Sequence, residues 1–394
     1  MKLRFISLLL LVPMLFCCNK AENNDNGGGN KEEQQTTPPA PEDELPPQIK
    51  DGDVILATNP NVEKFVTSVT YPENSYTSTH ILDADYQPTA PGKDDIPSKY
   101  TIRWETPKEG KAVVTLKEDT GWVRVFSGTD IIENSYVVVY NLLPNASYTF
   151  EVKVGEDVLS SGAFKTTGHV HQVYFSSVHN SRDLGGWKTK DGKKTVKYRK
   201  IYRGGRLNEG LLSRGKRVLV AEGIKAQLDL RGVDDVLDAE HCTLKGLVED
   251  YAFCAPVIEE GYIWMLRDDQ EKTLQCMKFI MQCVKENKPV YFHCSLGRDR
   301  TGTVALMVLG LLGVDEGEIS KEYEITQFAP HGYSVCTGET TKMTRKSDAD
   351  YWRAATYIWG FAKGGSFADG MQAYLLSIGI TQDEIDEFRS LMLE

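Results

Sequence analysis

The hydrophobic pattern of the chain changes near residue 167, and this change restricts the possible folds more than any other feature. Before it, apolar and polar residues alternate in short runs at 100–104, 111–116, 122–126, 135–140 and 147–154. Such alternation is typical of strands with one buried face, and a series of them separated by turns predicts an all-β sandwich. After it, compact apolar runs alternate with segments of helical spacing, which predicts an α/β domain with a central, mostly parallel sheet flanked by helices.

Four segments carry the α/β prediction. The runs 225–230 and 289–293 have the composition of buried strands. Between them, apolar residues recur at helical spacing over 274–284. The run 303–314 is apolar on all sides, which predicts a helix inside the domain, and it is too short to cross a bilayer, which needs about 20 residues.

The N-terminus predicts export. Lys2 and Arg4 precede the apolar run 5–16, which ends at Cys17 and Cys18. The segment resembles a bacterial lipoprotein signal in which Cys18 becomes the lipidated first residue after cleavage, with Cys17 as the small residue before the cut. We therefore expect a lipid-anchored protein of the bacterial cell envelope, on the periplasmic or surface face of the outer membrane. The alternative is an ordinary secretion signal with two incidental cysteines.

A polar segment follows the signal. Residues 19–52 are rich in Gly, Pro, Asn and Glu and carry few large apolar side chains, a composition that does not fold alone. We interpret it as a disordered linker that holds the folded body away from a membrane. The net charge of the whole chain is −11, which argues against nucleic acid as a partner.

The sandwich segment, 53–168, resembles a fibronectin type III module. Trp104 stands before Pro107, Tyr148 lies where a tyrosine corner belongs, and 163–166 forms a closing strand. We find no cluster of catalytic residue types here and expect a spacer or docking module, with ligand binding as the alternative.

The sequence HCSLGRDRTG at 293–302 joins a predicted strand to a predicted helix. A strand, a tight glycine loop and a helix N-terminus direct backbone N–H groups at one point, which makes an anion site suited to phosphate. Arg300 adds a planar fork of donors for two phosphate oxygens, and Cys294 then faces the phosphorus. A helix N-terminus beside an arginine favours the nucleophilic thiolate. Thr301 can donate to that sulfur when it leaves. His293 can order the loop from behind, with proton transfer as the alternative role.

Four motifs in order resemble the atypical bacterial tyrosine phosphatases, a branch of the Cys-based phosphatases that also attacks phosphoinositides. In chain order they are NSRDLGG at 180–186, YRGGRL at 202–207, LDLR at 228–231 and HCSLGRDRTG at 293–302. The sequence departs from the family pattern at Arg298, where Lys is usual, and at Gly204, where Ser is frequent. The first departure keeps the cation, and both could alter the choice of substrate.

The resemblance implies roles for individual residues. Asp299 would be the general acid and base, with Asp268 and Asp269 as rivals that precede Cys294 by 26 and 25 residues. A purely solvated or salt-bridging role for all three is the remaining reading. The loop residues Ser295, Leu296, Gly297, Arg298 and Thr301 would bind substrate. Arg182 and Asp183 would brace the loop or serve only the fold.

We therefore expect residues 169–394 to form a catalytic domain that hydrolyses phosphomonoesters through a phosphocysteine intermediate, with protein phosphotyrosine as the first candidate substrate. Phosphoinositides or inositol phosphates are the alternative substrates, and a relictual domain that only binds at the surface is the alternative function. No metal-ligand spacing is present, so we expect neither a metal nor a cofactor.

Overall fold

The computed structural model of the chain describes residues 45–68, 95–175, 178–207, 213–232, 244–256, 262–329 and 353–394. The predicted signal, its lipidation site Cys18 and most of the predicted linker lie outside these residues. Within the described ranges, no helix combines the length and the apolar character that a membrane span requires.

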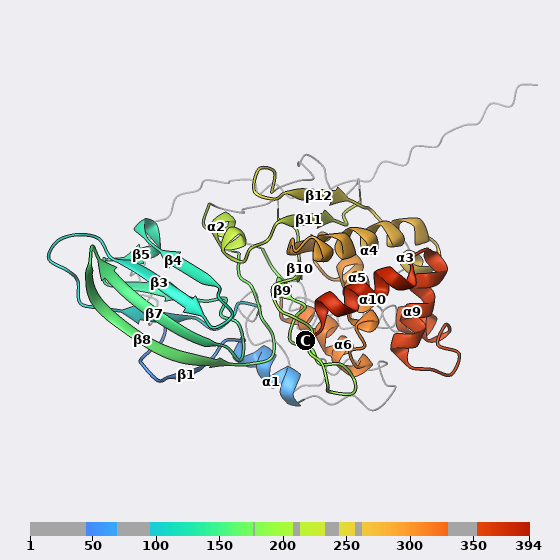
Figure 1. Cartoon of the computed structure of the whole chain (residues 1–394), viewed down its shortest axis with the longest axis horizontal. Helices are drawn as coiled ribbons and strands as arrows, with labels where there is room; N and C mark the ends of the chain where they lie inside the picture. The colour runs from blue at the N-terminus through green and yellow to red at the C-terminus, as the bar shows by residue number, and fades with distance from the viewer. Residues whose placement is uncertain are drawn as a thin grey trace, which may run out of the picture. The chain divides into compact units, whose positions relative to one another are not determined.

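The alternating runs of the sequence form two sheets (Figure 1). The larger has the strand order β1 (Val54–Leu56), β8 (Asp157–Thr167), β7 (Ser147–Val154), β3 (Val113–Glu118) and β4 (Val123–Phe126). The smaller has the order β2 (Tyr100–Arg103), β6 (Tyr136–Val139) and β5 (Ile131–Ile132). Neighbouring strands are antiparallel except β1 and β8, which are parallel. Each of the five alternating runs thus contains a strand.

The two sheets share one apolar core. Val114 and Leu116 of β3 face inward at alternate positions, and Val137 and Val139 of β6 meet them from the other sheet. The hydroxyl of Tyr148 accepts from the backbone N–H of Leu143 at 2.7 Å. This bond, from a tyrosine back to main chain a few residues upstream, is the one that a tyrosine corner requires. The relation to fibronectin type III stays a prediction.

The second half of the chain contains a five-stranded sheet. Its order is β12 (Asp250–Phe253), β11 (Ala226–Asp229), β13 (Val290–His293), β10 (Ile201–Gly204) and β9 (Arg182–Asp183). The first four strands are parallel, and β9 is antiparallel to β10. Gly204, Asp229 and His293 are in register, so three parallel strands end together, and the loops that follow them lie at one edge of the sheet.

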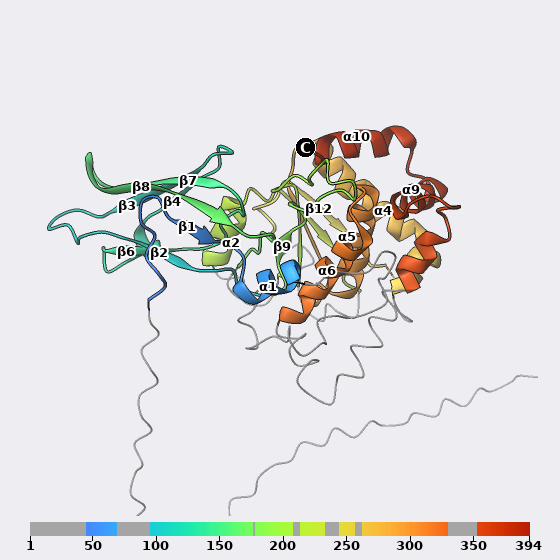
Figure 2. The ribbon, with the colours of Figure 1, turned by 90° about the horizontal axis from the view of Figure 1, so that it is seen from below.

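Helices cover this sheet. The described ones are α2 (Ser213–Ala221), α3 (Tyr262–Arg267), α4 (Gln270–Lys285), α5 (Asp299–Leu311), α6 (Glu316–Glu324), the 3₁₀ turn η5 (Ile325–Phe328), α9 (Phe367–Ile378) and α10 (Gln382–Met392). Figure 2 shows α4 and α5 alongside the strands. The α/β fold predicted for this part is confirmed.

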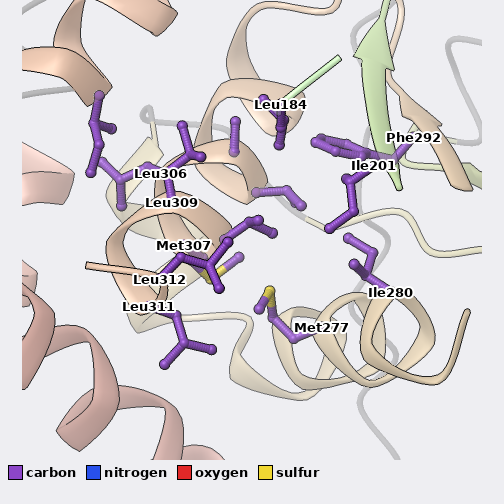
Figure 3. Close-up of a cluster of buried hydrophobic side chains, with 14 of the residues drawn as sticks. Leu184, Ile201, Met277, Ile280, Phe292, Leu306, Met307, Leu309, Leu311 and Leu312 are labelled. Atoms are coloured by element: carbon purple, nitrogen blue, oxygen red, sulfur yellow. The ribbon is translucent and has the colours of Figure 1, made fainter. Parts of the chain in front are cut away.

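One face of the sheet packs against α4 and α5. Figure 3 shows Ile201 and Phe292 from the strands near Ile280 of α4, with Leu306 and Leu309 of α5 in the same cluster. Every residue of α5 from Thr301 to Leu311 is buried, as its uniformly apolar sequence predicts. This packing holds the first turn of α5 at the end of β13.

The other face packs against α2 and a residue of the sandwich. Tyr202 and Tyr291 point to this side and share a cluster with Val218 and Leu219 of α2 and with Tyr140, which follows β6. Alternate strand residues therefore face opposite layers, and both layers are apolar.

Helix α1 (Pro60–Ser68) belongs to the core of the α/β part although it precedes the sandwich strands β2–β8. Val62, Phe65 and Val66 are at most 3% exposed and lie in the same cluster as α4 and α5. The ring of Phe65 is 5.7 Å from that of Phe328. The α/β core thus includes a helix from the segment 53–168.

Candidate active site

Cys294 lies directly after β13, and α5 begins five residues later at Asp299. The first N–H groups of an α-helix have no partner within the helix and favour anions, and the loop leads directly into this end of α5. Cys294 is a free thiol with only 5% of its surface exposed. The structure thus places Ser295, Leu296, Gly297 and Arg298 in a short turn between the sulfur and the helix.

Gly297 brings this turn against the end of β10. Its φ is +70°, and a Cβ there would lie 2.4 Å from the carbonyl carbon of Gly204. Only glycine fits both the backbone conformation and the close approach. Gly204 is equally confined, because a Cβ there would lie 2.1 Å from the hydroxyl oxygen of Tyr291. Two glycines therefore allow the loop to rest on the sheet.

Loop carbonyls are held by side chains from the two preceding motifs. The Asn180 amide donates to the carbonyls of Leu296 at 3.2 Å and Gly297 at 3.0 Å. Arg203 also donates to the Gly297 carbonyl. Side chains from both motifs therefore hold the backbone of the loop in place.

Two buried arginines share one carboxylate behind the loop. Glu322 of α6 accepts from Arg182 Nε at 2.7 Å and from Arg203 Nη1 at 3.0 Å. Arg182 also donates to the side-chain oxygen of Asn180. Burial, opposed by Glu322, lowers the pKa of Arg182 to about 9, so the guanidinium stays charged at neutral pH. Arg182 thus contacts the residue that holds the loop.

Asp183, its neighbour in β9, has other contacts. Its carboxylate accepts from the backbone N–H groups of Gly185 at 2.8 Å and Arg199 at 2.6 Å and lies 3.2 Å from His171 Nδ1. None of these partners belongs to residues 293–302. Arg182 and Asp183 are neighbours in β9, and the sequence suggests one shared role for them. Their side chains contact different parts of the fold because adjacent strand residues face opposite sides.

His293, the last residue of β13, is fully buried. Its Nε2 lies 3.0 Å from the Gln227 amide nitrogen, and its Nδ1 lies 3.1 Å from the Cys294 carbonyl oxygen. The Gln227 oxygen accepts from the N–H of Leu244 at 3.3 Å, so the amide nitrogen faces His293, and the imidazole proton is on Nδ1. Burial lowers the pKa of His293, and the neutral ring donates to the Cys294 carbonyl. This geometry orders the loop.

Arg300 is oriented by the strand beside β13. Its Nη1 donates to the carbonyl of Leu230 at 3.0 Å. The next residue, Arg231, is fully buried and forms an ion pair with Asp229 at 2.7 Å. The DLR motif therefore carries an internal salt bridge and a carbonyl that fixes the arginine of the loop.

The candidate acids differ in their surroundings. Asp299 is the first residue of α5, its side chain is 27% exposed, and it accepts from Arg298 Nε at 3.1 Å. Asp268 lies after α3 and is bound by Arg267 through Nε at 3.0 Å and Nη2 at 2.7 Å. These bonds lower the pKa of Asp268, which disfavours it as a proton donor. Asp269 is the N-cap residue of α4.

Two hydroxyls of the loop region are buried. The Oγ atoms of Ser295 and Thr301 are both inaccessible, and the described residues offer neither of them a hydrogen-bond partner. Thr301 itself is 0% exposed. A buried hydroxyl without a partner is costly unless a ligand or a reaction uses it.

Sequence reasoning gave no role to Asn180, Arg203, Gln227 or Glu322. Asn180 lies in the motif at 180–186 and Arg203 in the motif at 202–207. The motifs therefore marked both positions but did not indicate what the two side chains do. Gln227 and Glu322 carry no local signal.

The sequence comparisons with known proteins indicate one family. Residues 173–394, more than half of the chain, match the model described as the tyrosine phosphatase family. A tyrosine-protein phosphatase of Nostoc commune is 27% identical, over 43% of this chain and 67% of that protein. A relative from Cupriavidus necator is 28% identical, over 39% of this chain and 62% of that protein. The chain thus spans about two thirds of the length of these relatives.

Among solved structures, the core catalytic domain of the PP-IP phosphatase SIW14 from S. cerevisiae is similar with 14% identity and a TM-score of 0.26, covering 39% of this chain and 88% of that one. A mutant form of Tk-PTP is similar with 18% identity and a TM-score of 0.25, covering 39% and 91%.

Proposed function

Because the chain belongs to the tyrosine phosphatase family, we propose that it hydrolyses phosphomonoesters through a phosphocysteine intermediate formed on Cys294. The observation that carries this proposal is the position of Cys294 between β13 and the N-terminus of α5, with Arg300 oriented by the Leu230 carbonyl. A sulfur and an anion site thus share one loop.

In the first step, the Cys294 thiolate attacks the phosphorus and the bond to the ester oxygen breaks. The loop N–H groups and Arg300 hold the equatorial oxygens, on which negative charge accumulates. Asp299 gives its proton to the departing oxygen, so that an alcohol or a phenol leaves.

In the second step, water attacks the phosphocysteine. Asp299, now ionised, takes a proton from that water, and inorganic phosphate forms as the sulfur leaves as a thiolate. The hydroxyl of Thr301 is the proposed donor to that sulfur. Its burial without a partner among the described residues supports this role.

Replacement of Cys294 by Ser tests the proposal. The variant should lose turnover of a small aryl phosphate and still bind vanadate, because the anion site is built from main-chain groups. EDTA should leave the wild-type rate unchanged. Turnover by Cys294→Ser equal to the wild type would refute the mechanism, whereas a wild type without turnover would favour the relictual alternative.

Protein phosphotyrosine is our first candidate for the substrate, and phosphoinositides or inositol phosphates are the second. Both present a phosphomonoester to the same cations, Arg298 and Arg300. An assay of phosphopeptides, phosphoinositides and inositol phosphates under one condition distinguishes the two candidates. The substrate class with the highest kcat/KM is the preferred one.

We also propose that lipid on Cys18 anchors the protein in the cell envelope and that the sandwich is a fibronectin type III-like spacer. The Tyr148 hydroxyl bond supports the second assignment. Mass spectrometry of the mature N-terminus tests the first: a lipidated Cys18 supports it, and an unmodified N-terminal peptide contradicts it. Cys18→Ala should release the protein to the soluble fraction or block its maturation, whereas Cys17→Ala should leave the anchoring intact.

A further inference from the structure

We infer that Asp95 is a positioning residue for the phosphate-binding loop, although it lies outside residues 173–394 that match the family. This inference rests on the proposed function, since it concerns the same loop. Asp95 precedes β2 and belongs to the N-terminal part of the chain. Its side chain is 7% exposed.

The carboxylate of Asp95 contacts the start of the 180–186 motif. Its Oδ2 accepts from the backbone N–H of Asn180 at 3.0 Å and lies 3.1 Å from His179 Nδ1. The amide of Asn180 in turn donates to the carbonyls of Leu296 and Gly297. One residue therefore separates Asp95 from the loop that carries Cys294.

The backbone of Asn180 makes this contact important. Its φ is +60°, a left-handed conformation that only Gly adopts freely and that Asn tolerates at some cost. The bond from its N–H to Asp95 is one of the contacts that hold it there. A residue released from this conformation would redirect its side chain, and the loop carbonyls would lose a donor.

Charge supports the same arrangement. The negative charge of Asp95 raises the pKa of the buried Arg182 and so favours its charged form, and Arg182 donates to the Asn180 side chain. The carboxylate and the guanidinium thus hold Asn180 from two sides, one at its main chain and one at its side chain.

The segment that carries Asp95 is itself fixed. The Ile96 carbonyl accepts from Asn59 Nδ2 at 2.9 Å, and the Ser98 hydroxyl donates to the Thr58 carbonyl at 2.7 Å. Thr58 in turn donates to the carbonyl of Val170 at 3.1 Å. These bonds place Asp95 on a stable support beside the α/β part.

The test compares Asp95→Ala and Asp95→Asn in the full mature chain. Equilibrium vanadate affinity and kcat/KM on an aryl phosphate are measured, with thermal unfolding to establish folding. Asp95→Ala should weaken vanadate binding and lower kcat/KM by about tenfold or more, since small misplacements of catalytic groups cost that much or more. Asp95→Asn keeps an acceptor for the Asn180 N–H and should recover part of both.

Glu63→Gln is the matched control. Glu63, in α1, also accepts from a backbone N–H, that of His169 at 3.0 Å, and lies 2.7 Å from the same histidine's Nδ1. His169 lies outside the loop at 293–302 and outside the motifs at 180–186 and 202–207 that contact this loop. The vanadate affinity of Glu63→Gln should therefore equal that of the wild type.

Three results would overturn the inference: a folded Asp95→Ala with wild-type vanadate affinity, an equal loss in Glu63→Gln, or failure of both Asp95 variants to fold, which would make Asp95 a structural residue. Vanadate binding does not depend on turnover. A wild type that binds vanadate without hydrolysing esters would refute the proposed function. The vanadate affinities of the Asp95 variants would still decide this inference.

Discussion

Arg199 Nη2 donates to Glu118 Oε2 at 2.7 Å, and this ion pair connects the sandwich to the α/β part. The other terminal nitrogen of Arg199 donates to Glu222 at 2.7 Å, and its guanidinium lies 4.4 Å from the ring centroid of Trp122. Burial alone would lower the pKa of Arg199, but Glu222 and Glu118 outweigh it and raise the pKa. The cation is therefore charged in a largely buried position between two carboxylates.

Arg199→Met should destabilise the protein strongly, because it leaves Glu118 and Glu222 buried without their shared cation. Removal of one member of a buried ion pair typically costs about 3–5 kcal/mol. The free energy of unfolding from urea titration measures it.

Arg217→Met is the control for that change, because Arg217 of α2 pairs with Asp130 at 3.1 Å near the same boundary but is half exposed. It should cost about 0–1 kcal/mol. Equal effects of the two substitutions would show that the buried pair contributes no more than an exposed one.

Asp299→Asn should slow an ester with a poor leaving group far more than one with a good leaving group. General acid–base assistance is worth about 10²–10⁴-fold, and a good leaving group needs little of it. Rates for a series of aryl phosphates give the dependence on leaving-group pKa. Asp268→Asn should be mild, since Arg267 holds that carboxylate. The reverse ranking would assign the acid role to Asp268.

Gly204→Ser should destabilise the protein by about 1–3 kcal/mol, the usual cost of overpacking. The new Cβ would lie 2.1 Å from the Tyr291 hydroxyl, so the tyrosine must move. Tyr291→Phe removes that oxygen and should relieve part of the cost in the double variant. Additive effects in the thermal unfolding of the four proteins would contradict this contact.

Two histidines should make stability depend on pH. Hydrogen bonds to Glu63 and Asp95 raise the pKa values of His169 and His179 above 6.5. A raised folded-state pKa gives a stabilisation that is complete below about pH 6.5 and is lost as the pH rises through the folded value. The free energy of unfolding measured from pH 6 to 9 should fall less steeply in His169→Gln than in the wild type. Identical slopes would refute the contribution of His169.

Local features of the sequence determined the two classes of structure and the loop. The alternating strands of the first half each depend on residues that are close together in the sequence. The same is true of the strand, loop and helix around Cys294. Their side-chain periodicity and turn chemistry are set by the same short stretch of chain. The α/β fold and the place of Cys294 at a helix N-terminus could therefore be predicted.

Tertiary structure alone decided which distant residues support that loop. Asp95 contacts Asn180, and Glu322 contacts Arg182 and Arg203, which in turn contact Asn180 or the loop. Asp95 and Glu322 are 85 and 142 residues away from Asn180 along the chain, toward opposite ends. Nothing in their neighbouring residues indicates this. The same holds for Val62, Phe65 and Val66 of α1, which lie in the segment that the sequence assigns to the sandwich but pack in the core of the α/β part. Periodicity specifies which side chains of a segment share a face. The segment against which that face packs depends on the packing of the whole chain, which no short stretch of sequence encodes.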